Sequence, residues 1–382
     1  MSKWAGKYVI GLTGNIGTGK SVVRKMLEHL GAYGIDADVL SHRAISKGAP
    51  GFQQVLDMFG RWLLNSDGEI DRTKLGQLVF SNPEALIILE TIVHPLINQA
   101  IDMLVRRSSQ DVIVIEAIKL FESPLHEWCD KTWVTYLPQD TQIARLEKKR
   151  GMSLEEIQKR LEAQSEQEQK VNSADVVIYN DGEYEETWKQ VVAAWNDMFP
   201  GVEPEKTESV IEDFGEPGEE LRTVRGKPSN AQDIAELINK ITGDSSQIVT
   251  KGDVLEAFGE KAFILLKKGK MPVGLIGWQI ENLVARTTDI LIDSAVYIDE
   301  ALPKLLSEME KSSIDLQCEV SLVFVGDEIA SYASLWDLMG YKQKTPKQLG
   351  VAAWQEAAQE HMEASLILYS KQLRQDRVLR PI

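Results

Sequence analysis

The chain has 382 residues, of which 43% are hydrophobic and 26% are charged. This length predicts two or three domains, and the composition is that of a globular protein, which excludes fibrous and wholly disordered classes. With 42 basic and 58 acidic side chains the net charge is −16. We therefore expect neither nucleic acid nor an anionic membrane as a partner. The composition leaves the oligomeric state open.

The two cysteines, Cys129 and Cys318, are far apart in the sequence. They cannot form a disulfide framework, and no Cys-x-x-Cys pair indicates zinc. The first residues lack the apolar region and cleavage site of a signal peptide, and no uninterrupted run of about 18 apolar residues follows. The sequence therefore predicts a cytoplasmic protein.

Residues 1–199 alternate between strand-like and helical patterns. Short β-branched runs predict buried strands, and apolar residues three and four apart predict helices. In chain order the elements are expected at residues 7–12, 21–30, 32–35, 84–104, 112–115, 132–136, 154–169 and 176–178. Strands separated by helices imply a mostly parallel sheet, so we predict an α/β domain over 1–199.

Residues 200–228 are rich in Glu, Pro and Gly and poor in apolar residues. This composition predicts an acidic linker, because such a segment has little to bury and repels itself. Periodic sequence resumes beyond it, and we predict a second, α+β domain over 229–382. A further strand-like run, at 221–225, precedes this domain. Further elements are expected at 231–241, 262–266, 273–278, 289–296, 302–310 and 319–325.

The segment from Gly14 to Ser21 matches the phosphate-binding pattern G-x-x-x-x-G-K-[ST], with a predicted strand before it and a helix after it. The glycines allow a tight turn whose N–H groups point at phosphate oxygens, and the helix adds its positive end. Lys20 supplies charge to the β- and γ-phosphates, and the Ser21 hydroxyl is a ligand for Mg²⁺. The predicted nucleotide-binding residues are Gly14, Asn15, Ile16, Gly17, Thr18, Gly19, Lys20, Ser21 and Val22.

Other nucleotide-binding classes lack their signatures here. A GTPase needs an Asn-Lys-x-Asp guanine reader, and the nearest sequence, Thr250–Asp253, lies beyond the linker. No transporter-type signature is visible. The remaining class is a small kinase that phosphorylates a metabolite with ATP.

Two aspartates, Asp36 and Asp38, follow the second predicted strand. A metabolite kinase needs a carboxylate that orients the acceptor hydroxyl and takes its proton. Ligands of parallel sheets bind at the carboxyl ends of strands, which is where these residues lie. The alternative role is capping of the following helix. We expect Asp36 to be structural and Asp38 to be the catalytic base.

Glu116 ends a predicted strand and is the second candidate metal-site residue besides Ser21. It either holds a Mg²⁺-bound water or is an ordinary strand-end carboxylate, and the sequence leaves both open. A basic segment from Arg145 to Arg160 predicts a lid whose Arg145 and Arg150 neutralise transition-state charge. The alternative is a solvated helix with pairs such as Glu156 with Arg160.

Residues 7–199 resemble the dephospho-coenzyme A kinase family. The matching pieces are Ile10–Ser21, Ile35–Asp38, Asp67–Arg72, Val79–Pro83, His94–Ile97, Leu120–Glu122, Arg150–Ser153 with Arg160 and Gln164, Ala174–Asp175 and Asn180–Gly182. The resemblance implies a phosphate-binding core, a helical acceptor region and a lid. It also implies ATP-dependent phosphorylation of the ribose 3′-hydroxyl of dephospho-coenzyme A, the last step of coenzyme A synthesis.

By position, Asp38 matches the presumed base of that family, and Arg145 and Arg150 fall in its lid. His94 lies in the acceptor region and receives no chemical role. Lys119 stands where the family usually has an apolar residue, and it either pairs with a phosphate of the acceptor or simply with Glu122. The alternatives are a kinase for another nucleoside or sugar, and a non-catalytic nucleotide or coenzyme A sensor.

The layout of the second domain resembles a GNAT-type N-acetyltransferase. That family holds the pyrophosphate of acetyl-coenzyme A on a Gly-rich loop after its long strand. The corresponding residues, expected at Tyr297–Pro303, contain no glycine and two acids. We therefore expect a degenerate module with a structural or dimerisation role, and an active acetyltransferase is the alternative.

Overall fold

The computed structural model describes residues 3–200, 220–243, 248–375 and 378. The contacts of the chain form two compact units. Unit 1 consists of Met1–Ile35, Ser109–Gln279 and Asp289–Lys311, and unit 2 consists of Asp36–Ser108, Ile280–Thr288 and Ser312–Ile382. Most of the predicted acidic linker, residues 201–219, lies outside the described residues.

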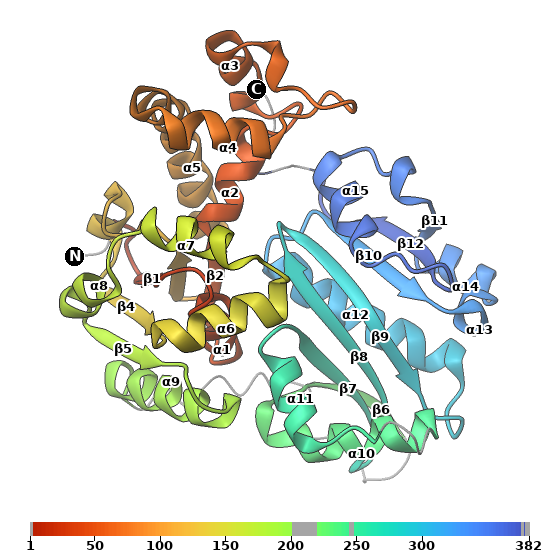
Figure 1. Cartoon of the computed structure of the whole chain (residues 1–382). Helices are drawn as coiled ribbons and strands as arrows, with labels where there is room; N and C mark the ends of the chain where they lie inside the picture. Colours follow the sequence, from red (N-terminus) through yellow and green to blue (C-terminus); the bar gives the residue numbers. More distant parts are fainter. Residues whose placement is uncertain (1–2, 201–219, 244–247, 376–377, 379–382) are drawn as a thin grey trace. The chain divides into compact units, whose positions relative to one another are not determined.

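The first sheet has five strands in the order β2-β3-β1-β4-β5 (Figure 1). The strands are β1 (Tyr8–Thr13), β2 (Tyr33–Asp36), β3 (Val112–Glu116), β4 (Lys131–Tyr136) and β5 (Val176–Tyr179). Strand β1 pairs in parallel with β3 and with β4, and β4 pairs in parallel with β5. The predicted parallel α/β sheet is therefore confirmed.

Helices α1 (Lys20–His29) and α9 (Tyr184–Met198) pack against each other. Their apolar faces join the strand residues Leu12 and Trp133 in one buried cluster, which includes Trp195. Because β1 leads directly into α1 through the glycine-rich segment, this cluster fixes the strand and the helix on either side of the predicted phosphate site.

The predicted helix over 154–169 is two helices, α7 (Leu154–Glu162) and α8 (Gln167–Ser173). The break has a physical reason, because the Gln164 side chain and the Ser165 carbonyl bond to the glycine-rich segment. Helix α6 (Gln139–Arg150) precedes them and ends at Gly151, whose φ of 60° is in the left-handed region.

Helices α2 (Ala37–Ala44), α3 (Pro50–Phe59) and α4 (Arg72–Ser81) each pack against α5 (Pro83–Arg107) in unit 2. Helix α5 is long and apolar enough to cross a membrane by length and composition alone. It carries Glu90, His94 and Asp102 and buries one face, which includes Ile97, Ile101 and Leu104. These four helices form the helical part that the sequence predicted.

The second sheet has seven strands in the order β11-β12-β10-β9-β8-β7-β6. Its strands are β6 (Leu221–Arg225), β7 (Ala262–Lys268), β8 (Met271–Glu281), β9 (Val284–Ile292), β10 (Val320–Val325), β11 (Lys342–Gln343) and β12 (Ile367–Gln372). Its helices are α10 (Ala231–Thr242), α11 (Lys251–Phe258), α12 (Ile298–Asp315), α13 (Asp327–Ala330), α14 (Ala333–Leu338) and α15 (Ala352–Gln359). Strands β9 and β10 pair in parallel, whereas β12 pairs antiparallel with β10 and β11. This mixed sheet confirms the predicted second α+β part, and β6 lies within the range predicted as linker.

The long strand predicted at 289–296 is in fact β9, Val284–Ile292. Its first half was missed because Arg286 and Thr287 are polar, yet both are buried, at 3% and 0% exposure. The turn before α12 is therefore residues 293–297 and not Tyr297–Pro303, and it too contains no glycine. There the Asp293 carboxylate accepts the Ala295 N–H at 2.9 Å and pairs with Lys240. A pyrophosphate at this turn would meet a carboxylate.

His29 closes helix α1 against α11. Its Nε2–H donates to the carbonyl oxygen of Phe258 at 2.9 Å, and the two rings meet edge to face with centroids 5.3 Å apart. Burial lowers the pKa of His29 to about 4, and the nearby charge of Arg225 acts in the same direction. The folded protein therefore holds this imidazole neutral.

This depressed pKa predicts a loss of stability in mild acid. Between about pH 6.5 and pH 4 the unfolded chain binds a proton that folded His29 does not, so the free energy of unfolding falls as the pH is lowered, by up to about 3 kcal/mol. His29→Gln keeps a donor for Phe258 but does not titrate. Thermal unfolding from pH 7.5 to pH 4.5 should show a flatter dependence in this variant, and equal slopes would contradict the assignment.

Candidate active site

The segment Gly14–Gly19 connects β1 to α1 in the turn that a phosphate site requires. Gly14, Gly17 and Gly19 have φ values of 150°, 79° and 92°, all in the region that favours glycine. Gly19 is the N-cap of α1, and no side chain caps this helix terminus. The first N–H groups of α1 are therefore available to an anion.

Contacts around the turn also exclude larger residues. A Cβ at Gly14 would lie 2.3 Å from Thr135 Oγ1, and one at Gly19 would lie 1.9 Å from Asn180 Nδ2. The backbone at these positions is thus packed directly against the ends of β4 and β5. The glycines of the motif are required by their neighbours as well as by their conformation.

The cation and the hydroxyl of the motif begin helix α1. Lys20 is 7% exposed, and its Nζ lies 3.4 Å from the carbonyl oxygen of Asn15. The Ser21 hydroxyl donates to Glu116 Oε1 at 3.0 Å, and Glu116 is itself 3% exposed at the end of β3. The structure therefore brings together Ser21 and Glu116, the two predicted metal-site residues.

Glu116 is held from its other side by Arg24. The Arg24 Nε lies 2.7 Å from Glu116 Oε2, and its Nη1 lies 2.6 Å from Glu28. Burial would raise the pKa of Glu28, but the charges of Lys25 and Arg24 outweigh it and lower that pKa to about 2. The arginine therefore lies between two carboxylates, which orients Glu116 towards Ser21.

The segment after α7 clamps the phosphate turn. Gln164 accepts the Ile16 N–H at 2.9 Å, and the Ser165 carbonyl accepts from Asn15 Nδ2 at 3.1 Å. Lys170, only 2% exposed, donates to Asn15 Oδ1 at 3.0 Å and to the carbonyl of Ile118 at 2.9 Å. Residues 164–170, called the lid-side segment below, are therefore connected directly to the turn by hydrogen bonds.

Asn180 follows β5 and supports the same turn from the other side. Its Nδ2 donates to the carbonyl of Thr18 at 2.9 Å, and its Oδ1 accepts from the Thr187 hydroxyl at 3.0 Å. The predicted lid residue Arg145 donates to the Asn180 carbonyl at 3.0 Å. Arg145 is thus placed beside the end of the phosphate turn.

Other parts of the basic segment behave as a solvated helix surface. Lys159 pairs with Glu155 at 2.8 Å, and Arg160 pairs with Glu156 at 3.8 Å, all four side chains being exposed. The alternative role weighed for this segment therefore applies to Arg160. The side chain of Arg150 lies outside the described part of the chain.

The structure supports one part of the prediction for Asp36 and Asp38, namely that Asp36 is structural. Asp36 is the N-cap of α2, because its Oδ1 accepts the Val39 N–H at 2.9 Å. Asp38 lies in the first turn of the same helix and is partly exposed. Asp36 is therefore the structural member of the pair.

The acceptor-side residues singled out in the sequence are placed as follows. Lys119 is exposed, and Glu122 accepts a hydrogen bond from the Ser165 hydroxyl at 2.7 Å. His94 is partly buried in α5, one residue before Pro95.

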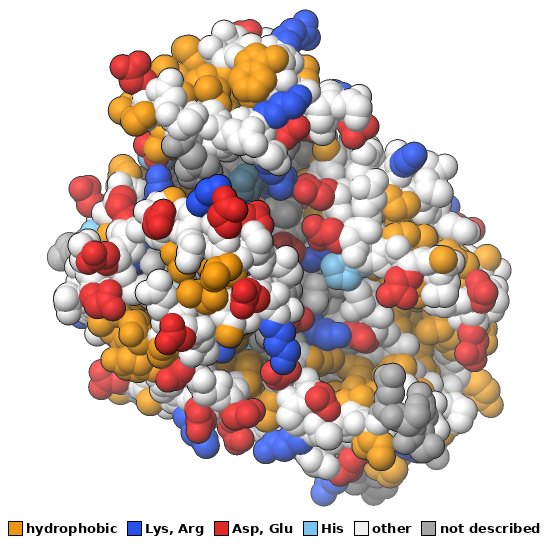
Figure 2. Space-filling model, in the orientation of Figure 1, with side chains coloured by type: hydrophobic (Ala, Val, Ile, Leu, Met, Phe, Trp, Pro, Cys, Tyr) orange, Lys and Arg blue, Asp and Glu red, His pale blue; other side chains and the backbone are white. Residues whose placement is uncertain are grey.

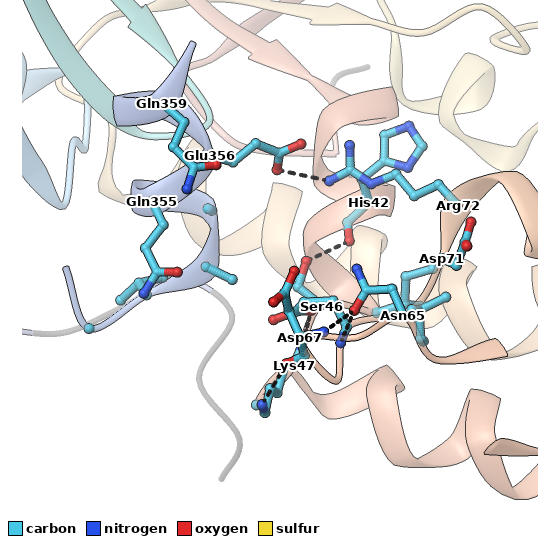
Figure 3. A pocket seen from close by; sticks show the side chains of 18 of the residues that line it. His42, Ser46, Lys47, Asn65, Asp67, Asp71, Arg72, Gln355, Glu356 and Gln359 are labelled. Atoms are coloured by element: carbon cyan, nitrogen blue, oxygen red, sulfur yellow. Dashed lines mark hydrogen bonds and ion pairs between the residues drawn. The ribbon is translucent and has the colours of Figure 1, made fainter. Parts of the chain in front are cut away.

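Unit 2 also contains an open polar cavity of about 1160 Å³. His42, Lys47 and Asp67 lie on one wall, and Gln355 and Gln359 of α15 lie on the other (Figure 3). Arg72 spans the two walls through an ion pair with Glu356 at 3.2 Å. None of the predicted site residues lines this cavity.

The first half of the chain is similar to known proteins. The dephospho-CoA kinase family model matches residues 8–186. The dephospho-CoA kinase of Carboxydothermus hydrogenoformans is 41% identical over 187 residues, which are 48% of this chain and 91% of that protein. That of Aquifex aeolicus is 42% identical over 190 residues, 50% of this chain and 96% of that protein. The chain belongs to the dephospho-CoA kinase family.

Solved structures match each half of the chain separately. Dephospho-CoA kinase from Campylobacter jejuni is 28% identical, covers 50% of this chain and 97% of that one, and has a TM-score of 0.38. The PaiA N-acetyltransferase of Thermoplasma acidophilum, solved with coenzyme A, is 12% identical, covers 40% and 99%, and has a TM-score of 0.32. Scores this low support no inference about function.

Family membership establishes the reaction. The chain is a kinase that uses ATP to phosphorylate the 3′-hydroxyl of dephospho-coenzyme A, which gives coenzyme A and ADP in the last step of coenzyme A biosynthesis. The relatives do not favour another nucleoside kinase or a non-catalytic sensor.

Sequence reasoning missed several residues that hold this kinase site together. Gln164 and Asn180 belong to the matching family motifs but received no role there. Arg24 and Lys170 were not singled out, because a lone basic residue on a helix gives no signal of its partner. Their positions after strand ends or on facing helices emerge only from the fold.

Proposed function

We propose that Asp38 is the general base of the kinase reaction. The observation that carries this assignment is that Asp36 is already used as the cap of α2, which leaves Asp38 in the first turn as the carboxylate for chemistry. Strand β2 ends at Asp36 in the sheet whose strand β1 leads into the phosphate turn. Ligands of parallel sheets bind at the carboxyl ends of strands, and Asp38 follows directly on the end of β2.

The chemistry assigned to these residues is in-line phosphoryl transfer. Asp38 accepts the proton of the ribose 3′-hydroxyl while that oxygen attacks the γ-phosphorus, and the bond to the β-phosphate oxygen breaks to release ADP. Lys20 and the N–H groups of the turn hold the β- and γ-phosphates. Arg145 neutralises charge that develops during transfer, and Arg150 is assigned the same task in the lid.

Ser21 and Glu116 are the residues that would hold Mg²⁺. Their hydroxyl and carboxylate oxygens lie 3.0 Å apart, and both are ligand types that this ion prefers. No group of three or more His, Cys, Asp or Glu side chains in the described part of the chain is arranged for a metal, which suits an ion that keeps waters and phosphate oxygens as ligands. When bound, Mg²⁺ supplies positive charge to the β- and γ-phosphate oxygens.

The surface and composition support a cytoplasmic enzyme of small metabolites. On the face drawn in Figure 2, Asp and Glu side chains are interspersed with Lys and Arg and form no single basic patch. The net charge of −16 adds a general repulsion of polyanions. We assign dephospho-coenzyme A as the substrate partner and propose residues 1–199 as the catalytic domain.

The base assignment predicts a specific loss of turnover. Asp38→Asn removes the proton acceptor but keeps the size of the side chain, so kcat should fall by about 10²- to 10⁴-fold while the KM for ATP stays within twofold. Asp36→Asn is the matched control, because asparagine also caps helices. Steady-state kinetics of both variants checks this, and full activity of Asp38→Asn would place the base elsewhere.

The metal assignment predicts a changed magnesium dependence. Glu116→Gln should raise the Mg²⁺ concentration for half-maximal rate by about tenfold, because a neutral amide is a poorer ligand. Glu28→Gln is the control, since it removes the other carboxylate partner of Arg24 without touching Ser21. A magnesium titration at saturating ATP measures both. An unchanged midpoint for Glu116→Gln would exclude this residue from the metal site.

A further inference from the structure

Helix α2 is tied to the second sheet by a buried arginine within unit 2. Arg43, 6% exposed, places its Nη2 2.9 Å from Glu319 Oε2. Its Nη1 donates to the carbonyl of Asn282 at 2.7 Å. One guanidinium thus bonds two separate acceptors of the C-terminal sequence through two of its nitrogens.

Both acceptors belong to fixed elements. Asn282 and Leu283 have φ values of 55° and 59°, the conformation of a two-residue hairpin turn, and they connect β8 to β9. Leucine is an uncommon residue in this conformation, so its surroundings must impose it. The turn directs the Asn282 carbonyl at Arg43.

Glu319 is held on several sides just before β10. Its N–H donates to the Leu283 carbonyl at 2.7 Å, and its carbonyl accepts the Leu373 N–H at 2.9 Å. Its Oε1 accepts the Val378 N–H at 3.2 Å, and the residue is fully buried. These bonds therefore fix the position of the Glu319 carboxylate independently of its ion pair with Arg43.

The geometry of α2 separates this contact from the proposed base. Asp38 and Arg43 are five residues apart on one helix, which places them about 140° apart around its axis. The anchor therefore holds the helix from a different face than the one that carries Asp38. Arg43 is close enough along the helix that its fixation limits rotation of the turn that carries Asp38.

A second ion pair, between Arg72 and Glu356, also connects the segments 36–108 and 312–382 of unit 2, but it is exposed. Arg72 and Glu356 are 3.2 Å apart with both side chains 53% exposed. An exposed pair contributes little, whereas removal of one partner from a buried pair leaves an uncompensated charge. Of these two connections, only Arg43–Glu319 can fix the position of a helix.

We propose that the C-terminal part of the chain is a positioning module for the kinase, and that Arg43 and Glu319 are positioning residues that orient helix α2 and with it Asp38. This proposal rests on the assignment of Asp38 as the base. It gives the second sheet a task in the kinase reaction that needs no acyl transfer.

The test combines kinetics with hydrogen exchange in the full-length chain. Glu319→Gln should lower kcat by about 10- to 100-fold, because small misplacements of a catalytic group have effects of this size. The KM for ATP should stay within twofold. Amide exchange of residues 39–44 should accelerate at least tenfold while the exchange of 20–29 in α1 is unchanged, and Glu319→Asp should restore part of kcat.

Glu356→Gln is the matched control, and we expect its kcat and its α2 exchange to stay within twofold of the parent. If Glu319→Gln does not fold, Arg43→Met with Glu319→Leu removes both charges, keeps the volume and should still show the reduced kcat. A parental kcat in either folded variant, or uniform acceleration of exchange over the whole chain, would overturn the proposal. Exchange of α2 needs no turnover, so it tests the anchor even if Asp38→Asn proves active.

Discussion

The structure depends on one constraint, namely that a buried parallel strand ends and a helix begins within six residues, Gly14–Gly19, with left-handed glycines in between. No side chain caps the start of α1, so its first N–H groups are available to an anion. We propose that a triphosphate satisfies those groups and that Lys20 adds the matching charge. Strand β1 is central in the first sheet, and residues of α1 and β1 share one buried cluster beside this turn.

The neighbours of the turn make it rigid before any nucleotide binds. Gln164 and Lys170 reach it from the lid-side segment, and Asn180 reaches it from the end of β5. Each contact uses a polar group that is buried or nearly so, and such a group would be costly without its partner. Buried polar contacts therefore hold residues 164–170 and the phosphate turn together.

Much of this could be predicted from the sequence because the decisive signals are local. The glycine spacing, the five strands and the cap formed by Asp36 all follow from residues close together in the chain.

The rest of the site depends on contacts at long range. Nothing near Lys170 indicates that it bonds to Asn15, and the break after α7 arises from those same contacts. The sequence predicts β9 to begin later than it does, because Arg286 and Thr287 are buried although polar residues are usually exposed. The Arg43–Glu319 pair joins positions 276 residues apart, so no pattern in the sequence announces it.

This kinase transfers a phosphoryl group to one hydroxyl of its substrate. The most direct measurement is ADP release, with mass analysis of the product, using dephospho-coenzyme A beside its 3′-deoxy analogue. We expect ADP and coenzyme A in equal amounts from the first substrate and only background ADP release from the second. Equal ADP release with the deoxy analogue, or none with dephospho-coenzyme A, would contradict it.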